Sequence, residues 1–324
     1  MAHPTRGVFL DLSTVDRDDL DLAPLHDALA DWALHPRTDP GETAARIGNA
    51  EVVVTNKVLL DADTLAAAPR LKLVCAAATG TNNIDTEAAR RLGITVSNAR
   101  DYATDSVVQH VFALLLTLVT RLDDYRADIR AGRWSASDQF CLLDYPIRSL
   151  AGMRMGIVGW GVLGRATARL AEAFGMQVLV AKSLREAVEP GDTQRHPLND
   201  VLASSDVISL HCPLTPETRH LLGDAALRRM PRGALLLNTA RGGLVDPVAL
   251  AAHLRSGHLG GAGIDVLEPE PPPADHPLLA DDIPNLVLTP HTAWAARSAR
   301  QRVIEEVAAN IRAFADGKPR NVVS

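Results

Sequence analysis

Three side chains suited to acid–base and ionic chemistry each follow a strand-like run. Arg241 follows the apolar run 234–238, Glu270 follows 263–266, and His291 follows 286–289. A guanidinium clamps a carboxylate and polarises a carbonyl. An imidazole donates a proton to a carbonyl oxygen, and a neighbouring carboxylate favours and orients its protonated form. These groups suit the reduction of a 2-oxo acid, but an ordinary surface ion pair and a packed histidine fit the same spacing.

A glycine-rich turn precedes all three. Gly159, Gly161 and Gly164 form G-x-G-x-x-G between the apolar run 155–158 and a helical pattern over 162–174 that opens with Val162 and Leu163. The first glycine permits a tight turn, the second admits a pyrophosphate, and the third lets helix and strand pack closely. The helix start offers unpaired N–H groups to phosphates. The context favours dinucleotide binding; the alternative is a packing turn.

Strand and helix patterns alternate along the chain, which predicts parallel α/β units. A long, nearly all-apolar helix is expected over 107–122 and an irregular arm over 123–150. The remaining expected strands are 8–12, 51–55, 71–76, 94–97, 177–181 and 206–210, and the remaining expected helices are 20–29, 85–92, 197–204, 224–229, 247–256 and 295–314.

Length and composition bound the class of protein. The 324 residues suggest two domains, and 47% hydrophobic with 22% charged residues is typical of a globular protein. The net charge of -6 indicates neither a nucleic-acid nor an anionic-membrane partner. Cys75, Cys141 and Cys212 form no metal spacing, so no metal is expected. The apolar segment 107–119 is too short to span a bilayer and contains Gln109 and His110. No secretory segment is expected, and a cytoplasmic location is predicted.

Four ordered motifs carry a resemblance. They are Gly159-x-Gly161-x-x-Gly164, Asn-Thr-Ala-Arg-Gly-Gly-Leu-Val-Asp at 238–246, Gly-x-Asp-Val-x-x-x-Glu-Pro at 263–271, and Thr-Pro-His-x-Ala at 289–293. Together with Ala-Thr-Gly-Thr-Asn-Asn-Ile-Asp at 78–85 they resemble the D-isomer-specific 2-hydroxyacid dehydrogenases over nearly the whole chain. The stretches 55–57, 139–144, 210–218 and 291–295 are most similar to the glycerate dehydrogenase (hydroxypyruvate reductase) branch.

The resemblance implies a fold. Two doubly wound parallel-sheet domains are expected, a flavodoxin-like substrate domain and a Rossmann cofactor domain, with a cleft between them. The substrate domain would comprise residues 1–101 completed by 292–324, and the cofactor domain residues 102–291. The family is usually dimeric through the long helix and the arm, so a homodimer is expected.

The resemblance also implies residue roles. Arg241 would clamp the substrate, His291 would donate the proton, and Glu270 rather than Glu268 would partner His291. Backbone N–H groups around Thr79 and Gly80 would hold the substrate carboxylate. The cofactor would be bound by the glycine turn with Val162 and Leu163, and by Thr104, Lys182, Cys212, Pro213, Thr239, Ala240 and Asp265, with Asp265 contacting the nicotinamide carboxamide or ribose.

One departure concerns the cofactor. Lys182 stands where family members that prefer NAD carry an acidic residue for the ribose 2′-hydroxyl. Lys182, Ser183 and Arg185 are suited to a 2′-phosphate, which slightly favours NADP(H). A solvated Lys182 with NAD(H) as cofactor is the alternative.

A second departure concerns the substrate loop. The family's Asn-x-Pro-Gly-Tyr is replaced by Asn98-Ala99-Arg100-Asp101-Tyr102. Arg100 suits a second anionic group on the substrate, but an Arg100–Asp101 ion pair in a reshaped turn is the favoured interpretation.

The sequence therefore predicts an NAD(P)H-dependent reductase of small 2-oxo acids, of hydroxypyruvate or glyoxylate type, giving D-2-hydroxy acids. Two alternatives stay open. A dinucleotide-sensing corepressor of the same fold is disfavoured by the lack of extra tails. Formate oxidation is disfavoured because formate dehydrogenases pair their histidine with an amide where this chain has Glu270.

Overall fold

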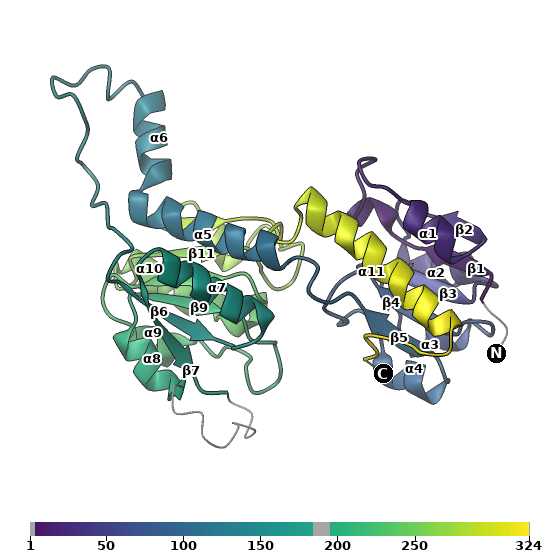
Figure 1. The fold of residues 1–324 in the computed structure, drawn as a ribbon. Coiled ribbons are helices and arrows are strands. Elements are labelled where there is room, and N and C mark those ends of the chain that lie inside the picture. The colour runs from purple at the N-terminus through teal and green to yellow at the C-terminus, as the bar shows by residue number, and fades with distance from the viewer. Residues whose placement is uncertain (1–3, 184–194, 324) are drawn as a thin grey trace. The chain divides into compact units, whose positions relative to one another are not determined.

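The computed structural model describes residues 4–183 and 195–323 (Figure 1). The chain forms two compact units: unit 1 comprises Met1–Ala103 and Trp294–Ser324, and unit 2 comprises Thr104–Ala293. The ends expected from the sequence, 101 and 292, each lie two residues from these boundaries. Both units contain a fully parallel sheet, which confirms the predicted α/β class with two parallel sheets.

Unit 1 is built on a five-stranded sheet with the order β2-β1-β3-β4-β5. This is the flavodoxin-like order. Because all five strands are parallel, their carboxyl ends lie at the same edge of the sheet. The sequence patterns did not indicate the half-exposed edge strand β2. The strands are β1 (Arg6–Phe9), β2 (Asp31–Leu34), β3 (Val52–Thr55), β4 (Leu73–Ala76) and β5 (Thr95–Asn98).

Short helices flank this sheet, and the long C-terminal helix α11 (Arg297–Ala315) packs against it. The apolar face of α11, which includes Val303, Val307 and Ile311, is buried against Phe9 and its neighbours. The other helices are α1 (Ala23–Ala28), α2 (Thr43–Ile47), α3 (Ala62–Ala66) and α4 (Thr86–Arg91), with 3-10 turns η1 (Leu12–Thr14) and η2 (Pro40–Glu42).

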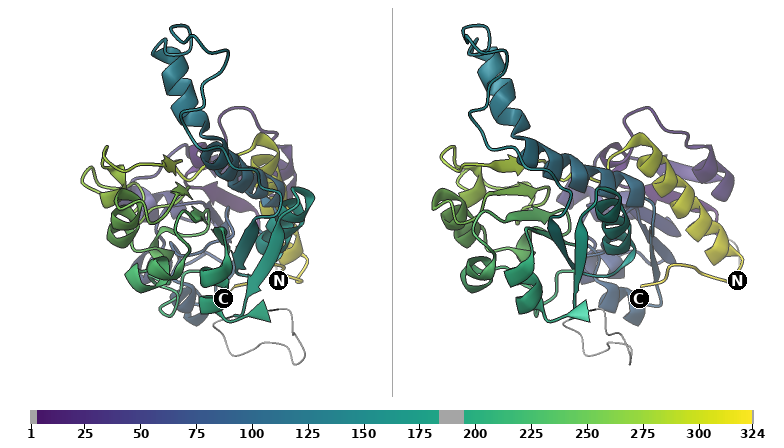
Figure 2. Two further views of the ribbon diagram at one scale, coloured as in Figure 1. Left: turned by 90° about the vertical axis from the view of Figure 1, so that its left-hand side faces the viewer. Right: turned by 60° about the vertical axis from the view of Figure 1, so that its left-hand side comes forward.

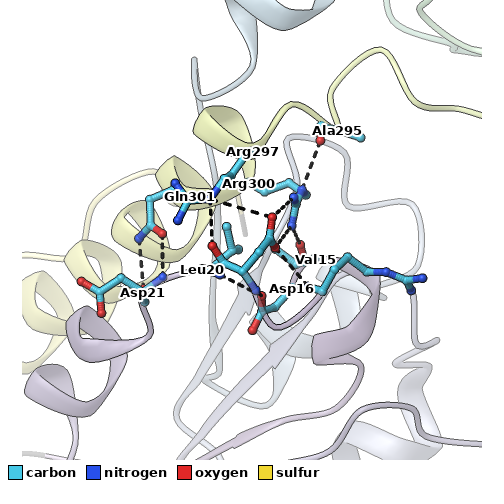
Figure 3. A network of polar contacts seen from close by, with 10 residues as sticks. Val15, Asp16, Leu20, Asp21, Ala295, Arg297, Arg300 and Gln301 are labelled. Carbon is cyan, nitrogen blue, oxygen red and sulfur yellow. Dashed lines mark hydrogen bonds and ion pairs between the residues drawn. The ribbon is translucent and has the colours of Figure 1, made fainter.

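Polar contacts fix the first turn of α11 (Figure 3). The Arg300 guanidinium donates to both carboxylate oxygens of Asp19 at 2.7 Å, and the Gln301 side chain exchanges two hydrogen bonds with the backbone of Asp21. The hydrogen bonds from Arg300 lower the pKa of Asp19 to about 2. A segment at the end of the chain is thereby fixed to the loop that follows β1.

Unit 2 contains a seven-stranded parallel sheet with the order β12-β11-β10-β9-β6-β7-β8. The chain runs outward from β6 in both directions, and a ligand crevice is expected at such a switch point. The strands are β6 (Arg154–Val158), β7 (Gln177–Ala181), β8 (Arg195–His196), β9 (Val207–Leu210), β10 (Leu235–Asn238), β11 (Gly261–Ile264) and β12 (Leu286–Leu288).

The helices of unit 2 cover this sheet, with α5 packed on α7 and on β10 and β11. No single helix in the described ranges is long and apolar enough to cross a membrane. The elements are α5 (Thr104–Thr120), α6 (Leu122–Arg130), α7 (Val162–Ala173), α8 (Leu198–Ser204), α9 (Asp224–Arg229) and α10 (Pro247–Arg255), with 3-10 turns η3 (Gly242–Leu244) and η4 (Pro277–Leu279).

The predicted irregular arm begins with a helix, which corrects the sequence expectation for residues 123–150. Arg121 adopts a left-handed conformation (φ 56°) that ends α5, and α6 follows at a bend of 61°. Within unit 2, α6 projects away from the sheet (Figures 1 and 2). Contacts inside the arm stabilise it. The rings of Tyr125 and Tyr145 pack edge to face with their centroids 5.0 Å apart, and Arg133 forms ion pairs with Asp128 and Asp144.

Candidate active site

The glycine turn directly follows β6. Gly159 has φ 105°, a conformation that side chains rarely adopt. A Cβ on Gly164 would lie 2.0 Å from the carbonyl oxygen of Gly159, whereas a Cβ on Gly161 would meet nothing within 4 Å. The first and third glycines are thus required by the turn and its packing, while the second faces open space. Open space at the start of α7 is what an approaching pyrophosphate needs.

The segment after β9 lies against this turn. A Cβ on Gly159 would stand 2.5 Å from the backbone of His211 and Cys212. Burial lowers the pKa of His211 to about 4 and raises that of Cys212 to about 11, so both side chains are uncharged at neutral pH. The predicted cofactor residues at 159 and 212–213 are therefore neighbours, and they present no fixed charge to a ligand.

Lys182 follows β7, the strand beside β6. Its backbone N–H donates to the carbonyl oxygen of His196 at 2.7 Å, and its side chain is exposed. Within the described ranges the Lys182 ammonium has no ion-pair partner. Ser183 is exposed as well, and Arg185 lies outside the described residues.

Arg241 is carried by a loop that Asn238 shapes at the end of β10. The Asn238 amide donates to the carbonyl oxygen of Arg241 at 2.8 Å and accepts from the N–H of Ala240 at 3.0 Å. The Arg241 guanidinium donates to the carbonyl oxygen of Ala240 at 2.7 Å. Among the described residues no carboxylate pairs with Arg241, so its fork is available to a ligand.

The loops after β10 and β11 meet at close range. A Cβ on Gly242 would lie 2.2 Å from the backbone of Leu267, so this approach requires glycine. The two carboxylates of the proline-rich run then point to different partners. Glu268 forms a two-bond ion pair with Arg219 at 2.7 and 3.1 Å, and this pairing lowers the pKa of Glu268.

Glu270 faces His291, the first residue beyond the Thr289-Pro290 pair after β12. The His291 Nδ1 atom lies 2.6 Å from Glu270 Oε2, and Glu270 Oε1 accepts from the N–H of Leu267 at 2.9 Å. Both side chains are part-exposed, at 28% and 34%. Because Nδ1 faces the carboxylate, Nε2 is the ring nitrogen that can reach a ligand.

Asp265 is fully buried, and the chain itself supplies its hydrogen bonds. Its carboxylate accepts from the Thr289 hydroxyl at 2.6 Å and from the N–H groups of Thr292 and Ala293 at 2.9 Å. Burial alone would raise the pKa of Asp265, but bonds from His110, Thr289 and the backbone hold it below its usual value. The carboxylate therefore holds the backbone of the His291 turn, and its expected contact with the nicotinamide stays a prediction.

Several residues of this network escaped the sequence patterns. His110 lies 2.8 Å from the Thr289 hydroxyl, and Ser106 donates to the carbonyl oxygen of Ala293 at 2.6 Å. The polar interruption of an otherwise apolar helix at His110 was the available signal. Thr104 begins α5 and lines a groove between α5 and α7 together with Arg169 and Phe174.

The predicted substrate loop lies in unit 1, after β4. The Thr79 hydroxyl donates to the carbonyl oxygen of Ala99 at 2.9 Å, and the Asn98 amide donates to that of Thr79 at 2.7 Å. In the described part of this unit, no acceptor within the chain takes the N–H groups of Thr79 and Gly80.

Arg100 and Asp101, which replace the family's Pro-Gly, lie in the segment that bonds to this loop. Arg100 donates from Nε to Asn98 Oδ1 at 3.2 Å, and Asp101 adopts φ 57°. The expected Arg100–Asp101 ion pair does not occur among the described residues. The left-handed backbone at Asp101 takes the place of a Pro-Gly turn, and the Asn98 amide oxygen accepts the hydrogen bond of the Arg100 guanidinium.

Comparison with known proteins decides the family. The profile described as "D-isomer specific 2-hydroxyacid dehydrogenase, NAD binding domain" matches residues 112–293. The chain belongs to this family. It is 46% identical over 284 residues to a glycerate dehydrogenase of Methylorubrum extorquens, covering 88% of each protein. It is 36% identical to a hydroxypyruvate reductase of Blautia hydrogenotrophica, covering 98% of this chain and 99% of the relative.

A solved structure shares the fold of this chain. An acyclic imino acid reductase in complex with NADPH and D-Arg superposes with a TM-score of 0.87 at 25% identity, covering 99% of this chain and all of that one. In the described residues, no three His, Cys, Asp or Glu side chains gather to hold a metal ion.

Proposed function

We propose that this protein reduces small 2-oxo acids to D-2-hydroxy acids with a nicotinamide dinucleotide, with hydroxypyruvate and glyoxylate as the substrate class. The proposal rests chiefly on the contact of His291 Nδ1 with Glu270 Oε2 at 2.6 Å. The same unit contains the glycine turn and Arg241, and no carboxylate of the described residues forms an ion pair with Arg241. The glycerate dehydrogenase and hydroxypyruvate reductase relatives support the same substrate class. Neither the corepressor alternative nor formate oxidation gains support from them.

The residues of unit 2 fit a dinucleotide. The open face of Gly161 and the N–H groups of Val162 and Leu163 in the first turn of α7 would bind the pyrophosphate. Uncharged Cys212 and Pro213 would line the adenosine ribose, and Thr239 with Ala240 the nicotinamide. The bound cofactor supplies the hydride for the carbonyl carbon.

The chain itself supplies the proton and the charge. His291 would donate from Nε2 to the carbonyl oxygen while Glu270 stabilises the imidazolium through Nδ1. Arg241 would bind the substrate carboxylate and polarise the carbonyl. The N–H groups of Thr79 and Gly80 would hold the carboxylate as well, because no described residue of the chain accepts from them.

A panel of 2-oxo acids tests the proposal. Hydroxypyruvate, glyoxylate, pyruvate and 2-oxoglutarate are each assayed with NADH and NADPH, with the product resolved as the D or L isomer where it is chiral. Turnover of hydroxypyruvate to D-glycerate and of glyoxylate to glycolate is expected. An enzyme that turns over none of the panel, yet changes its assembly state with dinucleotide, would instead be a sensor.

We further propose a preference for NADPH. The Lys182 ammonium just beyond β7, which pairs with no carboxylate of the described residues, suits a 2′-phosphate, and the imino acid reductase that shares the fold was solved with NADPH. Lys182→Asp is expected to shift the ratio of kcat/KM values toward NADH by roughly tenfold or more, the usual effect of one charged hydrogen bond. Lys182→Gln separates charge loss from charge reversal. A wild-type preference for NADH would reject the idea.

Arg100 is proposed to widen the range of substrates. Its guanidinium is bonded to the Asn98 amide, so no carboxylate of the described residues offsets its positive charge beside the Thr79 loop. Arg100→Ala should lower kcat/KM for dianionic 2-oxo acids by about tenfold and leave mono-anions nearly unchanged. Equal losses for both classes of substrate would show that Arg100 does not discriminate.

The arm is proposed to mediate a homodimer. Phe140, Leu143 and Ile147 are 90%, 83% and 58% exposed, although the arm is held in shape by its own ion pairs. Such a patch favours burial by a second chain. A Phe140→Ser/Leu143→Ser variant should elute as a monomer in light-scattering chromatography. If the double variant still elutes with the mass of a dimer, the dimer interface does not involve this patch.

A further inference from the structure

Two polar side chains on α5 contact the turn that carries His291. Ser106 donates from its hydroxyl to the carbonyl oxygen of Ala293 at 2.6 Å. The His110 Nε2 atom lies 2.8 Å from the Thr289 hydroxyl. Four positions separate Ser106 from His110, so both lie on the same face of α5, one turn apart. The helix therefore holds the turn at two points, before and after His291.

The direction of the hydrogen bonds follows from a count of protons. The Thr289 hydroxyl carries one proton, which it donates to Asp265 Oδ1 at 2.6 Å, since an ionised carboxylate can only accept. The same oxygen must then accept from His110. The His110 ring is consequently protonated on Nε2, with Asp265 Oδ1 3.4 Å away.

The other end of this chain of bonds reaches His291. The Asp265 carboxylate accepts from the N–H groups of Thr292 and Ala293, and the Asp265 carbonyl oxygen accepts from the N–H of His291 at 2.7 Å. His291 has φ 55°, a left-handed conformation that is uncommon outside glycine. Such a backbone persists only where its surroundings determine it, and these bonds do so.

We propose that His110 is a positioning residue for the reaction: through Thr289 and Asp265 it holds the backbone of His291 so that the imidazole meets Glu270. The hydrogen bonds of His110 reach neither His291 nor Glu270 directly, so its effect is indirect. The proposal rests on the proposed function for its kinetic consequences. Its structural consequence, order in the 289–293 turn, does not depend on the substrate.

Two variants at position 110 test it, with one control. His110→Leu removes the donor to Thr289, whereas His110→Gln keeps an N–H donor at similar reach. Gln109→Leu changes the exposed neighbour on the same helix and is the matched control. His110→Leu should lower kcat about tenfold or more, because small displacements of a reacting group cost up to about a hundredfold. KM and cofactor affinity should stay within about threefold, and His110→Gln should restore most of kcat.

A double-mutant cycle shows whether the effect passes through the His291–Glu270 pair. If His110→Leu acts by displacing that pair, its effect should largely vanish in a Glu270→Gln background, since residues of one network are not additive. Fully multiplicative losses would overturn the proposal. So would a His110→Gln variant as slow as His110→Leu.

Hydrogen exchange separates this proposal from the proposed function. The amides of Thr292 and Ala293 should exchange faster in His110→Leu than in wild type or His110→Gln, without substrate present. Unchanged exchange at these amides would reject the positioning role even in an active enzyme. A wild type that reduces no 2-oxo acid would reject the proposed function, and the exchange result would still decide the role of His110.

Discussion

Replacement of His291 by alanine is expected to lower kcat for hydroxypyruvate reduction by roughly 10²–10⁴-fold, the usual contribution of a positioned general acid. The His291 Nδ1 atom faces Glu270 at 2.6 Å, which leaves Nε2 to protonate the carbonyl oxygen. The glycine turn after β6 is untouched, so affinity for the dinucleotide should be unchanged. Stopped-flow reduction and fluorescence titration of the reduced cofactor measure the two quantities separately. Near-normal turnover would refute the assignment of His291.

Glutamine at position 270 gives a second test with a built-in control. Glu270→Gln removes the carboxylate that contacts His291 Nδ1 at 2.6 Å, so kcat for reduction should fall by about tenfold or more while cofactor affinity stays unchanged. Glu268→Gln changes a carboxylate two positions away that pairs with Arg219 instead, and it should leave kcat nearly unchanged. Equal losses of kcat in both variants would mean that the contact between Glu270 and His291 has no special role.

Alanine at position 241 is expected to lower kcat/KM for 2-oxo acids by about a thousandfold, since loss of one partner from a hydrogen-bonded charge pair costs about 2–5 kcal/mol. Within the described residues the Arg241 guanidinium bonds only to the carbonyl oxygen of Ala240, so its fork has no competing carboxylate. The loss should appear in kcat as well as KM, because polarisation of the carbonyl strengthens in the transition state. Steady-state kinetics over a range of substrate concentrations separates the two.

Two further variants sharpen this result. Arg241→Lys keeps the charge but not the planar fork, so it should recover only part of the activity. Arg228→Ala removes a guanidinium that pairs with Asp224 on the surface of α9 and should leave kcat/KM nearly unchanged. Equal activity of the Lys and Arg enzymes would show that Arg241 acts as a point charge and not as a bidentate clamp.

The elements with strong periodicity were predicted closely. The boundaries of β7 and α9 agree with the sequence patterns, and every expected strand of unit 2 is present. The edge strand β2 was missed because Asp31–Leu34 is half-exposed and lacks a buried run. The helix α6 was not predicted, although Leu122, Tyr125 and Ile129 recur at helical spacing in its nine residues; unlike a core helix, it leaves Leu122 and Ile129 exposed.

The short helices α2 and α3 were also missed. Each has five residues, fewer than two full turns, so neither gives a period that can be recognised against its surroundings. The sequence also favoured an ion pair between Arg100 and Asp101. The structure has a different arrangement: Asp101 adopts a left-handed φ, and Arg100 donates a hydrogen bond to Asn98.

By itself, the sequence determined the family of this protein and the residues that are candidates for its chemistry. Residue types and their order decide which groups are available, so the glycine turn, Arg241, Glu270 and His291 follow from the sequence alone. The tertiary structure decided which of these groups meet. Glu268 and Glu270 are near-identical in sequence context, yet the loops after β9 and β12 give one carboxylate Arg219 and the other His291. Packing likewise decided the hydrogen-bond partners of Asp265 and His110, because these partners come from elements far apart in the chain.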